Sequence, residues 1–279
     1  IVRWVNILYA LAVVISGLLL VFNDVLADTK IKLATTTSTE NSGLLERLLP
    51  VFENRENIKV LVIAVGTGQA IKMGRDGDAD ILLVHDSLEE KKFIEDGFGV
   101  SRREIMSNDF IIVGPREDPA KINGGLDAVK ALNKIYKSSA LFISRGDESG
   151  THKAEQRLWR RLTEDVPWDK NSAEWYNEVG AGMGQTLNIA IGMGAYTITD
   201  RGTWIAFDNK RGHKIMVEDT DILHNPYGVV LINKNKHPHT KAREAKLFYD
   251  WLVGSEAQKI IAEYKIGGQI LFSPNINIP

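Results

Sequence analysis

The chain has 279 residues, of which 44% are hydrophobic and 25% are charged. These fractions are ordinary for a soluble globular chain and exclude a disordered, collagen-like or polytopic membrane protein. A formal charge of −2, from 34 basic and 36 acidic residues, gives no electrostatic support for binding to nucleic acid. The absence of cysteine excludes disulfides, thiolate nucleophiles and cysteine-ligated metal sites.

Residues 1–27 have the pattern of an export signal. Residues 4–22 are almost continuously apolar, and Val25-Leu26-Ala27 places small residues three and one before the expected cut. We therefore predict a signal peptide that is cleaved after Ala27, and a periplasmic or otherwise extracytoplasmic location. A retained membrane anchor is the alternative, because the apolar run is long enough to span a bilayer.

Beyond residue 27, short β-rich apolar runs alternate with helix-length amphipathic stretches. Strands are expected at residues 31–34, 58–65, 80–84, 110–113, 141–143, 196–199 and 227–233. Helices are expected at residues 44–52, 69–75, 88–96, 126–137, 151–162, 185–193, 241–253 and 255–264. Pro50 is expected to kink or end the first helix. The alternation predicts an α/β fold in which helices cover parallel sheets.

Three loops that directly follow predicted strands are rich in hydroxyl groups and glycine. They are Thr35-Thr36-Thr37-Ser38-Thr39, Gly66-Thr67-Gly68-Gln69 and Arg145-Gly146-Asp147-Glu148-Ser149-Gly150-Thr151. In open α/β sheets ligands bind at the carboxyl ends of strands, against helix N-termini. If the loops converge, they offer neutral donors and one guanidinium, which suits a small tetrahedral oxyanion. Each loop alone is typical of a helix N-cap, but the coincidence of all three favours a binding site.

In these loops and in three further stretches, the chain resembles the tungstate-binding proteins of ABC importers. The further stretches are Gly182-Met183-Gly184-Gln185-Thr186-Leu187, Ala195-Tyr196-Thr197-Ile198-Thr199-Asp200-Arg201-Gly202-Thr203 and Asn225-Pro226-Tyr227. The resemblance runs along essentially the whole chain after residue 27, and the Thr-Thr-Thr-Ser stretch is its most specific part. The third loop is also similar to that of phosphate-binding proteins of the same fold. It therefore supports an oxyanion ligand strongly and tungstate only in part.

The resemblance implies a two-lobed periplasmic-binding-protein fold of type II, the Venus-flytrap arrangement. The chain would cross between the lobes twice, near Val113-Gly114 and near Asn225-Pro226. The first lobe would comprise residues 28–112 and 226–279, and the second lobe residues 113–225. The oxyanion would bridge the lobes and stabilise the closed form that an importer recognises. The implied ligand residues are Thr36, Thr37, Ser38 and Thr67 of the first lobe and Arg145, Ser149, Gly150 and Thr151 of the second.

The resemblance therefore implies a solute-binding protein that captures tungstate and delivers it to an ABC importer permease in the inner membrane. We expect the protein to be a monomer and to need no cofactor. A molybdate- or phosphate-binding protein of the same fold is one alternative, and a membrane-anchored oxyanion sensor is another. Tungstate and molybdate are bare dianions at neutral pH, whereas phosphate usually keeps a proton. Asp86 resembles the acidic residue that accepts this proton in phosphate-binding proteins, but a helix-cap role is favoured. The preference for tungstate over molybdate rests on the resemblance alone.

Other polar residues near the loops are interpreted as structural. These are Arg201, at a helix start, and His85 and His152, beside the binding loops. His237 and His239 have no nearby acidic partner, so no cation site is expected there. Gly182 and Gly184 could either free amide donors for the ligand or shape their loop. The spacings match no nucleophile elbow, dinucleotide fingerprint or P-loop, so no enzyme activity is expected.

Overall fold

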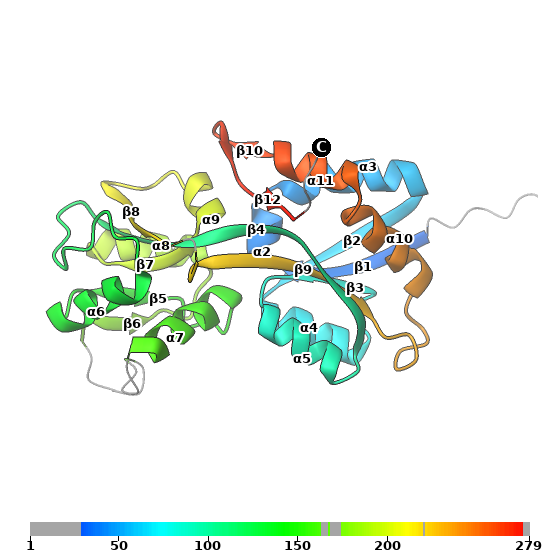
Figure 1. Cartoon of the computed structure of the whole chain (residues 1–279), viewed down its shortest axis with the longest axis horizontal. Helices are drawn as coiled ribbons and strands as arrows, with labels where there is room; N and C mark the ends of the chain where they lie inside the picture. Colours follow the sequence, from blue (N-terminus) through cyan, green and yellow to red (C-terminus); the bar gives the residue numbers. More distant parts are fainter. Residues whose placement is uncertain (1–28, 163–166, 168–173, 220, 276–279) are drawn as a thin grey trace, which may run out of the picture.

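The computed structural model describes residues 29–162, 167, 174–219 and 221–275, so the predicted export signal and its cleavage site lie outside the described residues. These residues form two lobes that lie side by side, with the long strand β4 (Gly99–Pro115) running from one into the other (Figure 1). The predicted α/β, two-lobed fold is confirmed. Among the described residues, no helix is long and apolar enough to cross a membrane.

The first lobe is built on a sheet with the strand order β12-β4-β9-β3-β1-β2. Strands β1 and β2 and strands β1 and β3 are parallel, whereas β9 runs antiparallel to β3. The strands not yet given are β1 (Thr29–Thr36), β2 (Ile58–Val65), β3 (Ile81–Val84), β9 (His224–Ile232) and β12 (Ser273–Pro274). A small hairpin, β10 (Lys265–Ile266) and β11 (Gln269–Ile270), precedes the last of these.

Helices cover both faces of this sheet, because both faces of its central strands are apolar. One face packs against α3, α10 and α11 through residues such as Leu48, Phe52 and Phe248. The other face packs against α4 and α5 through Ile71 and Phe93. The helices are α2 (Thr37–Asn41), α3 (Leu44–Glu56), α4 (Thr67–Asp76), α5 (Ser87–Glu95), α10 (Ala242–Leu252) and α11 (Ser255–Glu263).

The second lobe has an aromatic core around Phe142, Trp159 and Tyr196. The rings of Phe142 and Trp159 meet edge to face, with centroids 5.3 Å apart. Its parallel strand pair is β5 (Phe142–Ser144) and β6 (Tyr176–Glu178), and β7 (Thr197–Asp200) and β8 (His213–Glu218) pair with the end of β4. Its helices are α6 (Ala128–Ser138), α7 (Gly150–Leu162), α8 (Met183–Met193) and α9 (Arg201–Ala206).

Strand β4 changes its pairing partner part-way along its length. Up to Asp109 it pairs with β9, and from Phe110 onward it pairs with β7 and β8. This change precedes the Val113-Gly114 crossing expected from the sequence, and we propose the Asp109-Phe110 step as the first crossing. We propose that the second crossing lies at the start of β9, where Asn225 Nδ2 donates to Asn108 Oδ1 over 2.7 Å.

The prediction that Pro50 might end its helix was wrong, because α3 continues through Pro50 to Glu56. The first half of β4 was missed because its residues are largely polar and only partly buried, so no apolar run marks it. Strand β8 was missed as well, since it is recognisable only through its pairing with β4. Most other predicted elements match the observed bounds within a few residues.

Candidate oxyanion-binding site

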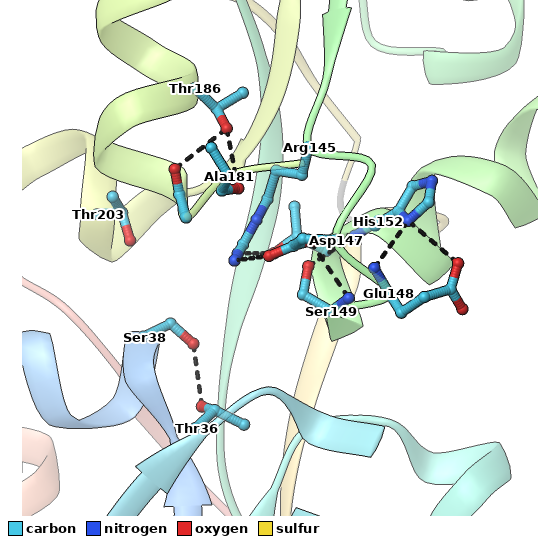
Figure 2. Close-up of polar contacts among 12 residues, drawn as sticks. Thr36, Ser38, Arg145, Asp147, Glu148, Ser149, His152, Ala181, Thr186 and Thr203 are labelled. Carbon is cyan, nitrogen blue, oxygen red and sulfur yellow. Dashed lines mark hydrogen bonds and ion pairs between the residues drawn. The ribbon is translucent and has the colours of Figure 1, made fainter. Parts of the chain in front are cut away.

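The first predicted loop forms the turn from β1 into α2. Thr36 is the N-cap of α2, and its hydroxyl accepts the Thr39 N–H over 3.2 Å. The Thr36 and Ser38 hydroxyl oxygens lie 3.0 Å apart (Figure 2). Thr37 is exposed and points its side chain away from the interior. The turn therefore presents the Ser38 hydroxyl, half-buried, at the edge of the first lobe.

The second loop meets the start of α7 across the two lobes. Thr67 opens α4 and Gly150 opens α7. A Cβ atom added to Gly150 would lie only 3.0 Å from Thr67 Oγ1 and 2.9 Å from His85 Cε1. Only glycine fits here without a shift, so the lobes are in close contact at this point. The Thr67 hydroxyl is buried and has no hydrogen-bond partner among the described residues.

The third loop holds a buried arginine, because only 6% of Arg145 is exposed. Its Nη2 donates to Asp147 Oδ2 over 2.5 Å, and its Nη1 lies 3.5 Å from Thr151 Oγ1. Its Nε is buried without a hydrogen-bond partner among the described residues. A buried donor without an acceptor is costly, so the Nε group indicates where an acceptor would bind. In Figure 2 the Arg145 guanidinium points toward Ser38 of the first lobe.

Two unusual backbone conformations shape this loop. Gly146 and Glu148 have φ angles of 60° and 57°, in the left-handed region. Glu148 is not glycine, and its N–H donates to His152 Nδ1 over 3.1 Å, which helps to hold the strained turn. The Ser149 hydroxyl accepts the His152 N–H over 3.2 Å, so Ser149 caps the start of α7. His152 is thus structural, as its position beside the loop indicated.

The start of α8 lies next to the same loop. The Ala181 N–H donates to the Arg145 carbonyl over 3.1 Å, which fixes the segment beside the guanidinium (Figure 2). Gly182 is the N-cap of α8, and no side chain caps this helix end. A helix N-terminus of this kind favours anions through its backbone N–H groups and its dipole. Gly182 therefore lies at a helix end without a side-chain cap, beside the third loop.

Asp86 has both carboxylate oxygens engaged by protein groups. One accepts the Glu89 N–H over 3.4 Å, which makes Asp86 the N-cap of α5. The other accepts from Arg157 Nη1 of the second lobe over 3.1 Å. The favoured cap role is therefore observed, together with an interlobe ion pair that the sequence did not indicate. Each oxygen of Asp86 therefore has a protein partner in the structure.

The remaining candidates have structural partners. Arg201 donates to both oxygens of Asp109 over 2.6 Å and to Glu218 over 3.1 Å, so it holds the crossing between the lobes. His239 Nε2 contacts the Gly77 carbonyl at 2.9 Å. Within the described part of the chain, no group of three or more histidine, aspartate or glutamate residues could hold a metal ion.

Comparison with known proteins agrees with this geometry. The family model of the PBP superfamily domain matches residues 26–256. The tungstate-binding protein TupA of Peptoclostridium acidaminophilum is 46% identical over 253 residues, covering 89% of this chain and 87% of that protein. This chain belongs to the PBP superfamily and to its TupA family.

Another relative and two solved structures align over similar lengths. A putative ABC transporter anion-binding protein of Haloferax volcanii is 43% identical, covering 88% of this chain and 72% of that protein. The solved structure of TupA from Desulfovibrio alaskensis G20 is 43% identical, with a TM-score of 0.78 and coverage of 89% and 100% of the two chains. The tungstate ABC transporter structure from Geobacter sulfurreducens is 47% identical, with a TM-score of 0.74 and coverage of 84% and 98%. The resemblance to a periplasmic binding protein is confirmed.

Proposed function

We propose that this chain is an extracytoplasmic solute-binding protein that captures tungstate between its lobes and delivers it to the permease of an ABC importer. Two buried donors carry the proposal, Arg145 Nε in one lobe and Thr67 Oγ1 in the other, because neither has a hydrogen-bond partner among the residues that the structure describes. An anion between the lobes would accept from both. TupA proteins of similar sequence are described as tungstate-binding, which supports the choice of ligand.

The donors of the site come from both lobes, so the bound anion would hold the lobes together. Arg145 would supply the charge, and the neighbouring hydroxyl and amide groups would complete the shell without further positive charge. Thr37, whose side chain is exposed, would contribute its backbone N–H. The proposed shell comprises Thr36, Thr37, Ser38 and Thr67, and Arg145, Ser149, Gly150 and Thr151.

The partners that Asp86 already has in the protein favour a bare dianion over hydrogen phosphate. Phosphate needs a carboxylate or similar group to receive its proton, and both oxygens of Asp86 are engaged. Tungstate and molybdate only accept hydrogen bonds and fit a shell of donors equally well. Tungstate is preferred because of the TupA relatives, and molybdate is the second candidate.

Isothermal titration calorimetry tests the ligand. Residues 28–279 would be unfolded and refolded to remove bound anions, then titrated with tungstate, molybdate, phosphate and sulfate. We expect tungstate to bind far more tightly than phosphate and sulfate. Tight binding of phosphate with weak binding of tungstate would refute the proposed ligand and would indicate that Asp86 turns into the site.

The mature N-terminus tests the location. We propose export with cleavage after Ala27 and a monomeric protein that moves between its ligand and the permease. Mass spectrometry of the protein expressed with its N-terminal segment in a Gram-negative host should find Asp28 at the N-terminus of the protein in the periplasmic fraction. An intact N-terminal segment in the membrane fraction would favour the anchored sensor instead.

A further inference from the structure

His85 connects the crossing between the lobes with the first binding loop. It follows β3 and is buried, with its ring stacked on Tyr227 at a centroid distance of 4.8 Å. Its Nδ1 lies 3.0 Å from Asn225 Oδ1, at the second crossing. Its Nε2 lies 3.2 Å from Ser38 Oγ, in the proposed anion shell. The imidazole therefore has two polar partners, one at each ring nitrogen.

The partner at Nδ1 determines which nitrogen carries the proton of the neutral ring. The Asn225 amide is assigned from its hydrogen bonds: with Nδ2 donating to Asn108 Oδ1 over 2.7 Å, its Oδ1 faces His85 as an acceptor. In this assignment, Nδ1 of His85 carries a hydrogen. In neutral imidazole the other nitrogen, Nε2, is an acceptor, and Ser38 must donate to it.

This arrangement has a consequence for Ser38, because a serine hydroxyl has only one proton to donate. While His85 is neutral, that proton is directed at Nε2. Ser38 then presents only lone pairs to the space between the lobes. These lone pairs would repel an anion that only accepts hydrogen bonds. If Nε2 also carries a proton, it donates to Ser38 Oγ, and the hydroxyl proton is free to turn toward the anion.

The charges around His85 favour the neutral ring before the anion binds. Burial lowers the pKa of His85, and Arg145 lowers it further, whereas Asp200, Asp86 and the Asn225 bond raise it. Asp200 is already engaged, because it accepts the N–H of Thr203 over 2.7 Å. Burial also raises the pKa of Tyr227, so the stacked phenol stays neutral. A dianion bound beside Ser38 would add a strong attraction for a proton on the ring.

We propose that His85 is a positioning residue that sets the direction of the Ser38 hydroxyl by taking up one proton from solvent when a dianion binds. The inference rests on the proposed function. In the proposed site, the protein groups would contact the oxygen atoms of the anion and not its metal centre. His85 would thereby favour bare dianions, for which every site group must be a donor.

Proton uptake is measured by titrating tungstate calorimetrically at one pH in buffers of different ionisation enthalpy, such as Tris, HEPES and PIPES. The observed enthalpy should vary linearly with the buffer enthalpy, with a slope that approaches one proton taken up per anion near pH 7. The Kd should rise by up to about tenfold per pH unit as the pH increases toward 8.5, because the bound state holds the extra proton.

The variant His85→Gln keeps a donor and an acceptor but does not titrate in this range, and it should lose both the slope and the pH dependence. His213→Gln is the matched control, because His213 is also buried with a lowered pKa but contacts the Ala195 carbonyl in the second lobe. This control should keep the wild-type slope. In nitrogen NMR spectra of the wild type, both ring nitrogens of His85 should be protonated only in the tungstate complex.

Two failures are distinguishable. Tight tungstate binding whose enthalpy does not depend on the buffer, with a neutral His85 ring in the complex, would overturn the role of His85 and leave the proposed function intact. No binding of tungstate in any buffer would overturn the proposed function itself.

Discussion

Replacement of Arg145 by alanine is the sharpest test of the anion site. Arg145 is a buried cation that faces the space between the lobes, and its Nε has no acceptor in the described part of the chain. The variant removes the charge and the donors while leaving the loop's own backbone contacts. It also leaves Asp147, the present partner of the guanidinium, as an uncompensated carboxylate beside the anion.

The magnitude follows from the lost contacts. A hydrogen bond to a charged group contributes about 1.5–3 kcal/mol, so loss of the guanidinium should weaken anion binding by at least about 2–3 kcal/mol. This corresponds to an increase in Kd of roughly 30- to 150-fold. Repulsion from Asp147 should add to the loss, and the double variant Arg145→Ala, Asp147→Asn should recover part of the affinity.

The assay is calorimetry with tungstate on the stripped protein, with competition titrations if binding is too tight to measure directly. Arg116→Ala is the control, because Arg116 is an exposed arginine just beyond β4. It removes the same charge from the protein and should leave Kd within twofold. An unchanged Kd in Arg145→Ala, or an equal loss in Arg116→Ala, would refute the assignment of Arg145 to the site.

Three further variants test other parts of the structure. Gly150→Ala should raise Kd at least tenfold, because the added Cβ would lie 3.0 Å from Thr67 Oγ1 and 2.9 Å from His85 Cε1 and would hold the lobes apart. Calorimetry with tungstate checks this, and unchanged affinity would contradict the close approach of the lobes. Arg157→Ala breaks a partly exposed ion pair with Asp86 and should raise Kd only about two- to fivefold, so a loss as large as that of Arg145→Ala would be unexpected. Burial raises the pKa of Glu155 to about 8, so the folded chain holds a proton that the unfolded chain releases above its ordinary pKa of 4.5. The free energy of unfolding should therefore fall by up to about 1.4 kcal/mol per unit as pH rises from about 5 to 8, and Glu155→Gln should flatten this slope in urea titrations.

Much of the α/β architecture could be predicted from the sequence, because it depends on local periodicity. The apolar run at residues 58–65 coincides with β2 in the structure. Long polar strands and short edge strands could not be predicted this way. Residues 101–104 of β4 are partly or fully exposed, and only pairing with β9 keeps them extended.

The three loops could be recognised because donors that follow strands have a distinctive composition. The sequence of these loops does not show which of the polar groups in and near them already have hydrogen-bond partners in the protein. The structure shows that Asp86 is occupied by Glu89 N–H and by Arg157 of the other lobe. Arg157 lies far from Asp86 in the chain, so no local pattern could have indicated the pair.

The sequence by itself determined the α/β class and the hydroxyl- and glycine-rich loops suited to an oxyanion, because periodicity and loop composition are local properties. Only the tertiary structure decided how these loops meet. It brought Gly150 against Thr67, left Arg145 Nε without an acceptor among the described residues, and joined Ser38 to Asn225 through His85. Contacts between distant segments depend on how the lobes pack, and a hydrogen-bond donor is available to a ligand only if that packing leaves it without a protein partner.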